Sequence, residues 1–288
     1  GEFDSFLNGK ILGDEYERLF TFLDELGVPK NNILYCNFNY LINDTFNDTE
    51  IRVKYHNFTR FNLYNINKDK KDSMLEFFNQ QKNKLRENYY LSYNHQGKPH
   101  RKEIVDFLEK SDIKGLLSAS WKNLVLDGSL GEENWTNNNS NLYYYHNREH
   151  FFNSYFSIIT ESHFADTPGS LNLGFTEKTW KPIINFHPFC ILGAKNSLSK
   201  LNELGFETFT ELFDERYDDL ESGTQFDSPR IKHIRSDLER IFSKPIYELD
   251  DIYYSMEEKV VHNFQHFFKL CETEINEFED YLINFCNS

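Results

Sequence analysis

Three short segments of the sequence carry side chains that suit a phosphate-bearing ligand. They cover residues 94–101, 160–162 and 176–182. Lysine and arginine side chains pair with phosphate oxygens through charge-assisted hydrogen bonds. Carboxylate oxygens accept hydrogen bonds from hydroxyl groups such as those of a ribose. The three segments therefore predict a site for a phosphorylated ligand.

The third segment holds the most specific arrangement of these residues. A helix is predicted to begin at Thr176, which places Lys178 in its first turn, where backbone N–H groups favour an anion. Together with Arg101, this lysine would give a diphosphate two charge-assisted partners. Glu177 can accept hydrogen bonds from the two hydroxyls of a ribose. The alternative interpretation is structural, with Thr176 as the N-cap, Glu177 as a first-turn carboxylate and Lys178 as a solvated charge.

Alternating strand and helix patterns must position these segments. Strands are predicted at 33–38, 51–56, 88–95, 155–162 and 187–193, helices at 14–26, 73–86, 99–110, 176–186, 197–206, 229–242 and 247–286, and a polar loop at 122–141. This order favours an α/β protein with a mainly parallel sheet. Because ligands bind outside the carboxyl ends of such strands, we expect the three segments to face one crevice.

The strand and helix series restarts near residue 87, which predicts three parts. We expect an N-terminal α/β domain at 1–87, a Rossmann-like domain at 88–250 and a C-terminal helix at 251–288. An 87-residue first half is short for a domain of this type, and Gly1-Glu2-Phe3 looks like a cloning scar. Both features favour missing sequence upstream.

Several motifs of common enzyme classes are absent from the sequence. It has no G-x-G-x-x-G, no G-x-x-x-x-G-K-[ST], no G-x-S-x-G and no His-Glu-x-x-His. These absences count against a dinucleotide dehydrogenase and a P-loop NTPase. An Asp-x-Asp metal clamp is missing too, and the pairs His146/His150 and His262/His266 lack a nearby third ligand. We therefore expect no metal.

Composition limits the kinds of partner that the protein is expected to bind and the cell compartment in which it is expected to lie. The chain has 288 residues and a net charge of −15, so tight nonspecific nucleic-acid binding is not expected. It has no run of 18 apolar residues and no visible signal peptide, which predicts no membrane span. Its four cysteines form no Cys-x-x-Cys motif and are expected to be reduced, which favours the cytoplasm, or the host cytoplasm for a viral protein.

A family resemblance rests on four ordered segments. FSIITES and, after a loop, FTEKTWKPIINFHPFCILGAKNSLSKLNELGFETF resemble the donor-binding half of fucosyltransferase-like glycosyltransferases of the GT-B architecture. Glycosyltransferase-like proteins of phages and large viruses show the same pattern. YYLSYNHQGKPHRKEIVDFL resembles the family's Asn-Arg…His-Arg segment, although His95 stands where arginine is more usual. FDERYDD and VVHNFQHF extend the likeness over residues 88–270.

The resemblance implies a GT-B-like fold and a nucleotide-diphosphate sugar as donor. The donor-binding residues would be Asn94, His95, Arg101, Thr176, Glu177 and Lys178, and the catalytic residues Glu161, Lys178 and Arg101. Lys178 and Arg101 would stabilise the leaving diphosphate, while Glu161 would bind the sugar or position the helix that carries Glu177. The long C-terminal helix would cross back to the first domain.

The expected activity is inverting transfer of the sugar to an acceptor hydroxyl of a glycan, protein or nucleotide. In this family the base is a carboxylate of the N-terminal domain, and no residue in 1–87 stands out for that role. Two alternatives stay open. One is a catalytically degenerate glycosyltransferase-like module that only binds, and the other is a sugar or phosphate hydrolase that uses the same crevice.

Overall fold

A computed structural model describes residues 21–37, 52–126, 146–164, 173–223 and 228–287 of the chain. Its centre is a four-stranded parallel sheet in the order β4-β3-β5-β6. The strands are β3 (Asn88–Asn94), β4 (Leu116–Ala119), β5 (Ser154–Thr160) and β6 (Phe189–Leu192). All seven residues of β5 are buried, as expected for a parallel strand covered on both faces. The predicted α/β class with a parallel sheet is confirmed.

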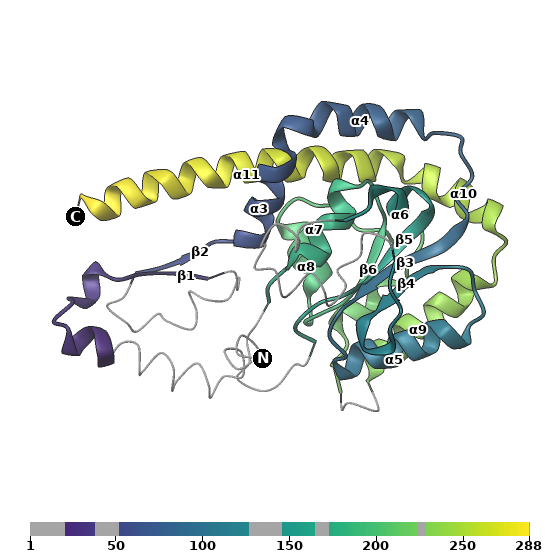
Figure 1. The fold of residues 1–288 in the computed structure, drawn as a ribbon, viewed down its shortest axis with the longest axis horizontal. Coiled ribbons are helices and arrows are strands. Elements are labelled where there is room, and N and C mark those ends of the chain that lie inside the picture. The colour runs from purple at the N-terminus through teal and green to yellow at the C-terminus, as the bar shows by residue number, and fades with distance from the viewer. Residues whose placement is uncertain (1–20, 38–51, 127–145, 165–172, 224–227, 288) are drawn as a thin grey trace.

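Helices form one layer on each side of this sheet (Figure 1). On one side, α5 (Pro99–Lys110) packs against α9 (Pro229–Phe242). On the other side, α7 (Glu177–Ile184) contacts both α3 (Phe58–Asn67) and α11 (Glu257–Cys286). The α9 sequence explains this packing, because Ile231, Ile234, Leu238 and Ile241 recur at helical spacing and are buried.

A second, two-stranded parallel sheet lies beside the end of α11. It consists of β1 (Leu34–Asn37) and β2 (Arg52–Tyr55). The Arg52 guanidinium lies 4.9 Å from the ring centroid of Phe285, and Lys54 Nζ lies 5.1 Å from that of Tyr281. The C-terminal end of α11 therefore returns to the strands of the N-terminal segment (Figure 1).

The hydrophobic core continues across residue 87. Helix α3 and helix α4 (Lys71–Gln80) contribute Phe61 and Phe78 to the same core as the sheet. The Phe78 ring stacks on Phe186 with 4.3 Å between centroids. The division near residue 87 stays a prediction, and these two helices share their packing with the segment that follows it.

Several predicted elements differ from the observed ones. Helix α3, strand β4 and helix α6 (Arg148–Phe152) were not predicted, and the helix expected at 73–86 spans Lys71–Gln80 instead. The stretch 247–286 forms two helices, α10 (Ile246–Ser255) and α11. The helix predicted at 14–26 and the loop at 122–141 lie mostly outside the described residues. Helix α8 (Ser197–Glu203) is followed by Gly205 at a φ of +89°, which matches the predicted glycine stop.

Within the described ranges, no helix combines the length and apolar character that crossing a membrane requires. The four cysteines are free thiols.

A buried histidine connects β5 to the loop before β6. The His187 ring is 1% exposed, with Nδ1 2.7 Å from Ser157 Oγ and Nε2 2.8 Å from the Ser154 carbonyl oxygen. Burial, helped by the charge of Arg86, holds the pKa of His187 well below its usual value. The imidazole is therefore neutral in the folded protein.

Because His187 is buried in its neutral form, we expect the protein to lose stability in acid. In the unfolded chain it binds a proton as the pH falls below about 6.5, whereas in the folded chain it stays neutral. The neutral histidine therefore costs no stability above that pH. Between pH 7 and pH 5, proton binding to the unfolded chain lowers the free energy of unfolding by about 2 kcal/mol. Urea unfolding at both pH values measures the change. His187→Asn should show a smaller change by that amount, and an identical pH dependence in both proteins would contradict the assignment.

Candidate functional site

The order in which the chain adds strands to the parallel sheet reverses between β3 and β5. The chain runs from β3 outward to β4 and then returns to place β5 on the other side of β3. The helices that follow β3 and β5, α5 and α7, cover opposite faces of the sheet (Figure 1). In open α/β sheets, ligands bind in the crevice outside the carboxyl ends of such a pair of strands.

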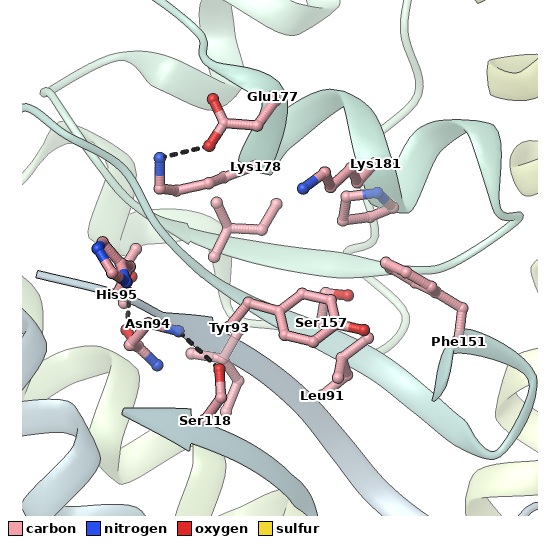
Figure 2. A pocket seen from close by; sticks show the side chains of 14 residues that line it. Leu91, Tyr93, Asn94, His95, Ser118, Phe151, Ser157, Glu177, Lys178 and Lys181 are labelled. Atoms are coloured by element: carbon pink, nitrogen blue, oxygen red, sulfur yellow. Dashed lines mark hydrogen bonds and ion pairs between the residues drawn. The ribbon is translucent and has the colours of Figure 1, made fainter. Parts of the chain in front are cut away.

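A pocket lies at this reversal, between the ends of β3 and β5 and helix α7 (Figure 2). Its empty volume is about 680 Å³, opening to solvent included. The lining residues are Leu91, Tyr93, Asn94, His95, Ser118, Phe151, Ser157, Ile158, Ile159, Thr160, Glu177, Lys178, Lys181 and Pro182. One part of the wall is therefore apolar, and another carries charged and polar groups.

Glu161 anchors the start of α7 to the end of β5. Its Oε1 accepts hydrogen bonds from the Thr176 backbone N–H at 3.0 Å and from Thr179 Oγ1 at 2.7 Å. Its Oε2 accepts from Thr176 Oγ1 at 2.7 Å and from the Ser162 backbone N–H at 3.2 Å. Thr176 in turn caps the helix by accepting from the Lys178 N–H, as the structural interpretation of the sequence expected. The Glu161 carboxylate is thus occupied in holding the helix.

Helix α7 supplies the charges of the pocket. Glu177 is only 5% exposed, and Lys178 Nζ donates to its Oε1 at 2.8 Å. Burial raises the pKa of Glu177, but the charges of Lys178 and Lys181 and the hydrogen bond from Lys178 outweigh burial and hold the pKa below its usual value. Glu177 is therefore ionised at neutral pH, and the pocket carries two amines around one carboxylate.

Polar groups at the end of β3 face this helix from across the pocket (Figure 2). Asn94 Oδ1 accepts a hydrogen bond from Thr160 Oγ1 at 2.7 Å, which links β3 to β5. His95 Nδ1 lies 2.9 Å from Ser120 Oγ, and the Tyr93 hydroxyl lies 2.7 Å from His150 Nδ1. Asn94, His95, Glu177 and Lys178 all line this one pocket, as expected for segments that face one crevice.

Arg101, which was predicted to hold a diphosphate, contacts backbone carbonyl oxygens in this structure. It is 2% exposed, lies in the first turn of α5 and does not line the pocket. Its guanidinium donates to the carbonyl oxygens of Gln96 at 3.3 Å and Glu161 at 3.2 Å. The helix start at Pro99 turns Arg101 toward these carbonyls. Glu161 and Thr176 do not line the pocket either, so in this structure these three residues support the segments that carry the pocket residues.

Lys181 lines the pocket and was missed by the sequence reasoning. It lies one turn after Lys178 and four residues after Glu177, on the same face of α7. It is 8% exposed, and burial lowers its pKa to about 8 in spite of the opposing charge of Glu177. The i,i+4 spacing from Glu177 was the available signal, because a helix starting at Thr176 places both side chains on one face.

The two histidine pairs have no third metal-ligating side chain beside them in the part of the chain that the structure describes. Among the residues that the structure describes, no group of three or more His, Cys, Asp or Glu side chains could hold a metal ion. His262 and His266 instead contact the carbonyl oxygens of Gly205 and Leu204. No residue of the described ranges 21–37 and 52–87 lines the pocket, so the expected N-terminal base is not identified there.

Comparisons with family models, curated proteins and solved structures found no match for this chain.

Proposed function

We propose that this chain is a glycosyltransferase that takes its sugar from a nucleoside diphosphate sugar. One observation carries the proposal. Two lysines and an ionised glutamate from one helix line a pocket at the point where the strand order of the parallel sheet reverses. In this proposal Lys178 and Lys181 bind the diphosphate and Glu177 binds the ribose. Asn94 and His95 complete the donor site, and the fold would be a GT-B-like arrangement.

Charge stabilisation is the main catalytic contribution in this proposal. As the bond to the sugar breaks, negative charge grows on the departing diphosphate, and cations already fixed in place stabilise it without rearrangement. Glu177 holds Lys178 in position by an ion pair of 2.8 Å. Glu161, Thr176 and Arg101 keep α7 and its neighbouring loop in place. The acceptor would be a glycan, a protein or a nucleotide in the cytoplasm, and its deprotonating base is unassigned.

The proposal is tested by incubating the protein with a panel of nucleoside diphosphate sugars and measuring the released nucleoside diphosphate. We expect slow release from one donor without acceptor, faster release when a suitable acceptor hydroxyl is present, and no release by Lys178→Met. The matched control is Lys200→Met, since Lys200 lies on α8, pairs with Glu203 and does not line the pocket.

The two alternatives give different results in the same assay. A degenerate module would bind a nucleoside diphosphate sugar without releasing the diphosphate. A hydrolase would release free sugar or phosphate at a rate that acceptor libraries do not change. Either result would contradict transfer.

A further inference from the structure

We infer that Lys181 is a nucleophilic amine that captures small aldehydes carrying an anionic group, by forming an imine inside the pocket. The inference rests on the position and surroundings of this one side chain. Imine formation does not require that the pocket act on a nucleotide sugar. A lysine that only attracts anions by its charge would not form an imine.

The surroundings of Lys181 raise the share of its neutral amine form above that of an ordinary lysine. The side chain is 8% exposed and points into the pocket (Figure 2). Ile158, Phe151 and Pro182 contribute apolar surface to the same pocket. A second cation, Lys178, lies one helical turn away. Removal from water and a neighbouring positive charge are the two conditions that activate lysine as a nucleophile.

The titration of Lys181 agrees with this geometry. Burial lowers its pKa most, the charge of Lys178 lowers it further, and the charge of Glu177 opposes both, with a result of about 8. At pH 7 roughly a tenth of such an amine is neutral, whereas an ordinary lysine is neutral in less than about one part in a thousand. Lys181 therefore presents far more of the reactive form than a surface lysine does.

Lys178 selects the kind of aldehyde. Its ammonium lies in the same pocket and can pair with a phosphate or carboxylate on the ligand. The neutral Lys181 nitrogen then attacks the carbonyl carbon, and one proton moves from this nitrogen to the carbonyl oxygen to give a carbinolamine. The hydroxyl leaves as water with the second proton of the nitrogen, and the imine remains. No oxidant or reductant is needed, so the step balances with the protein and the aldehyde alone.

Pyridoxal 5′-phosphate is a suitable probe, because it joins an aldehyde to a phosphate. The protein is incubated with the probe at pH 8, sodium borohydride reduces the imine to a stable secondary amine, and mass spectrometry locates the label. We expect Lys181 to be labelled at least about 10-fold faster than the exposed Lys84. Pyridoxal without the phosphate should label Lys181 more slowly than the phosphorylated probe.

Lys181→Arg is the matched control, because it keeps the positive charge and forms no such imine. Its urea unfolding curve shows whether the fold survives, and inorganic pyrophosphate should protect Lys181 in the unaltered protein. Equal labelling of Lys181 and Lys84, or labelling that pyrophosphate does not slow, would overturn the inference. If pyrophosphate protects Lys181 but no nucleoside diphosphate does, the inference holds and the proposed function fails.

Discussion

Replacing Lys178 with alanine is expected to weaken the binding of a nucleoside diphosphate on the order of 100-fold. The substitution removes a charge-assisted contact to phosphate, and such hydrogen bonds contribute about 1.5–3 kcal/mol. It also removes the ammonium that pairs with the buried Glu177 carboxylate. That carboxylate would then repel the incoming anion. Isothermal titration calorimetry measures the change in dissociation constant.

Lys200→Ala is the control for this substitution. Lys200 lies on α8, pairs with Glu203 at 2.8 Å and does not line the pocket, so its loss should leave the affinity unchanged. Equal affinity in the Lys178 and Lys200 variants would show that the diphosphate does not use α7.

Glu161→Ala is expected to lower the free energy of unfolding by about 4 kcal/mol, since each buried donor left without an acceptor costs about 1–3 kcal/mol. Three buried donors lose their acceptor, namely the Thr176 backbone N–H, Thr176 Oγ1 and Thr179 Oγ1, and so does the half-buried Ser162 backbone N–H. Because these groups hold the first turn of α7, Glu177 and Lys178 should also lose their positions. Urea denaturation measures the loss of stability.

Thr179→Val is the comparison variant, because it removes one of the hydrogen bonds to the Glu161 carboxylate and keeps the side chain buried. It removes one hydrogen bond to Glu161 with little change of shape, so it should lower stability by only about 1–3 kcal/mol. If Glu161→Ala destabilises the protein no more than Thr179→Val does, the carboxylate is not the anchor of the helix.

The central elements of the fold could be predicted because their sequences are locally consistent. The strand at Asn88–Asn94 and the helix at Pro99–Lys110 matched, since an apolar run precedes a proline suited to a first helical turn. Helix α3 was missed because its segment is rich in asparagine. Its stability comes from the Asn57 cap and from tertiary burial of Phe61 and Leu63. Tertiary contacts of this kind leave little signal in a short segment.

The candidate site was predictable in its location and only partly in its residues. Strand ends and a helix start placed Glu177 and Lys178 correctly on one pocket wall. Residue type alone could not show that Arg101 donates to the backbone carbonyls of Gln96 and Glu161. Backbone carbonyls at a buried turn compete with any ligand for a guanidinium, and that competition depends on loop geometry. Lys181 was missed because its burial depends on how α7 packs.

The most direct test of the proposed donor site is calorimetric titration of the protein with UDP, GDP, CDP, ADP and dTDP, with and without magnesium. A diphosphate site at α7 predicts selective binding of one of these diphosphates, with an affinity that does not depend on the metal. Lys200→Ala should keep this affinity, and Lys178→Ala should weaken it on the order of 100-fold. Binding of none of them, or binding that Lys178→Ala leaves unchanged, would contradict a diphosphate site at α7.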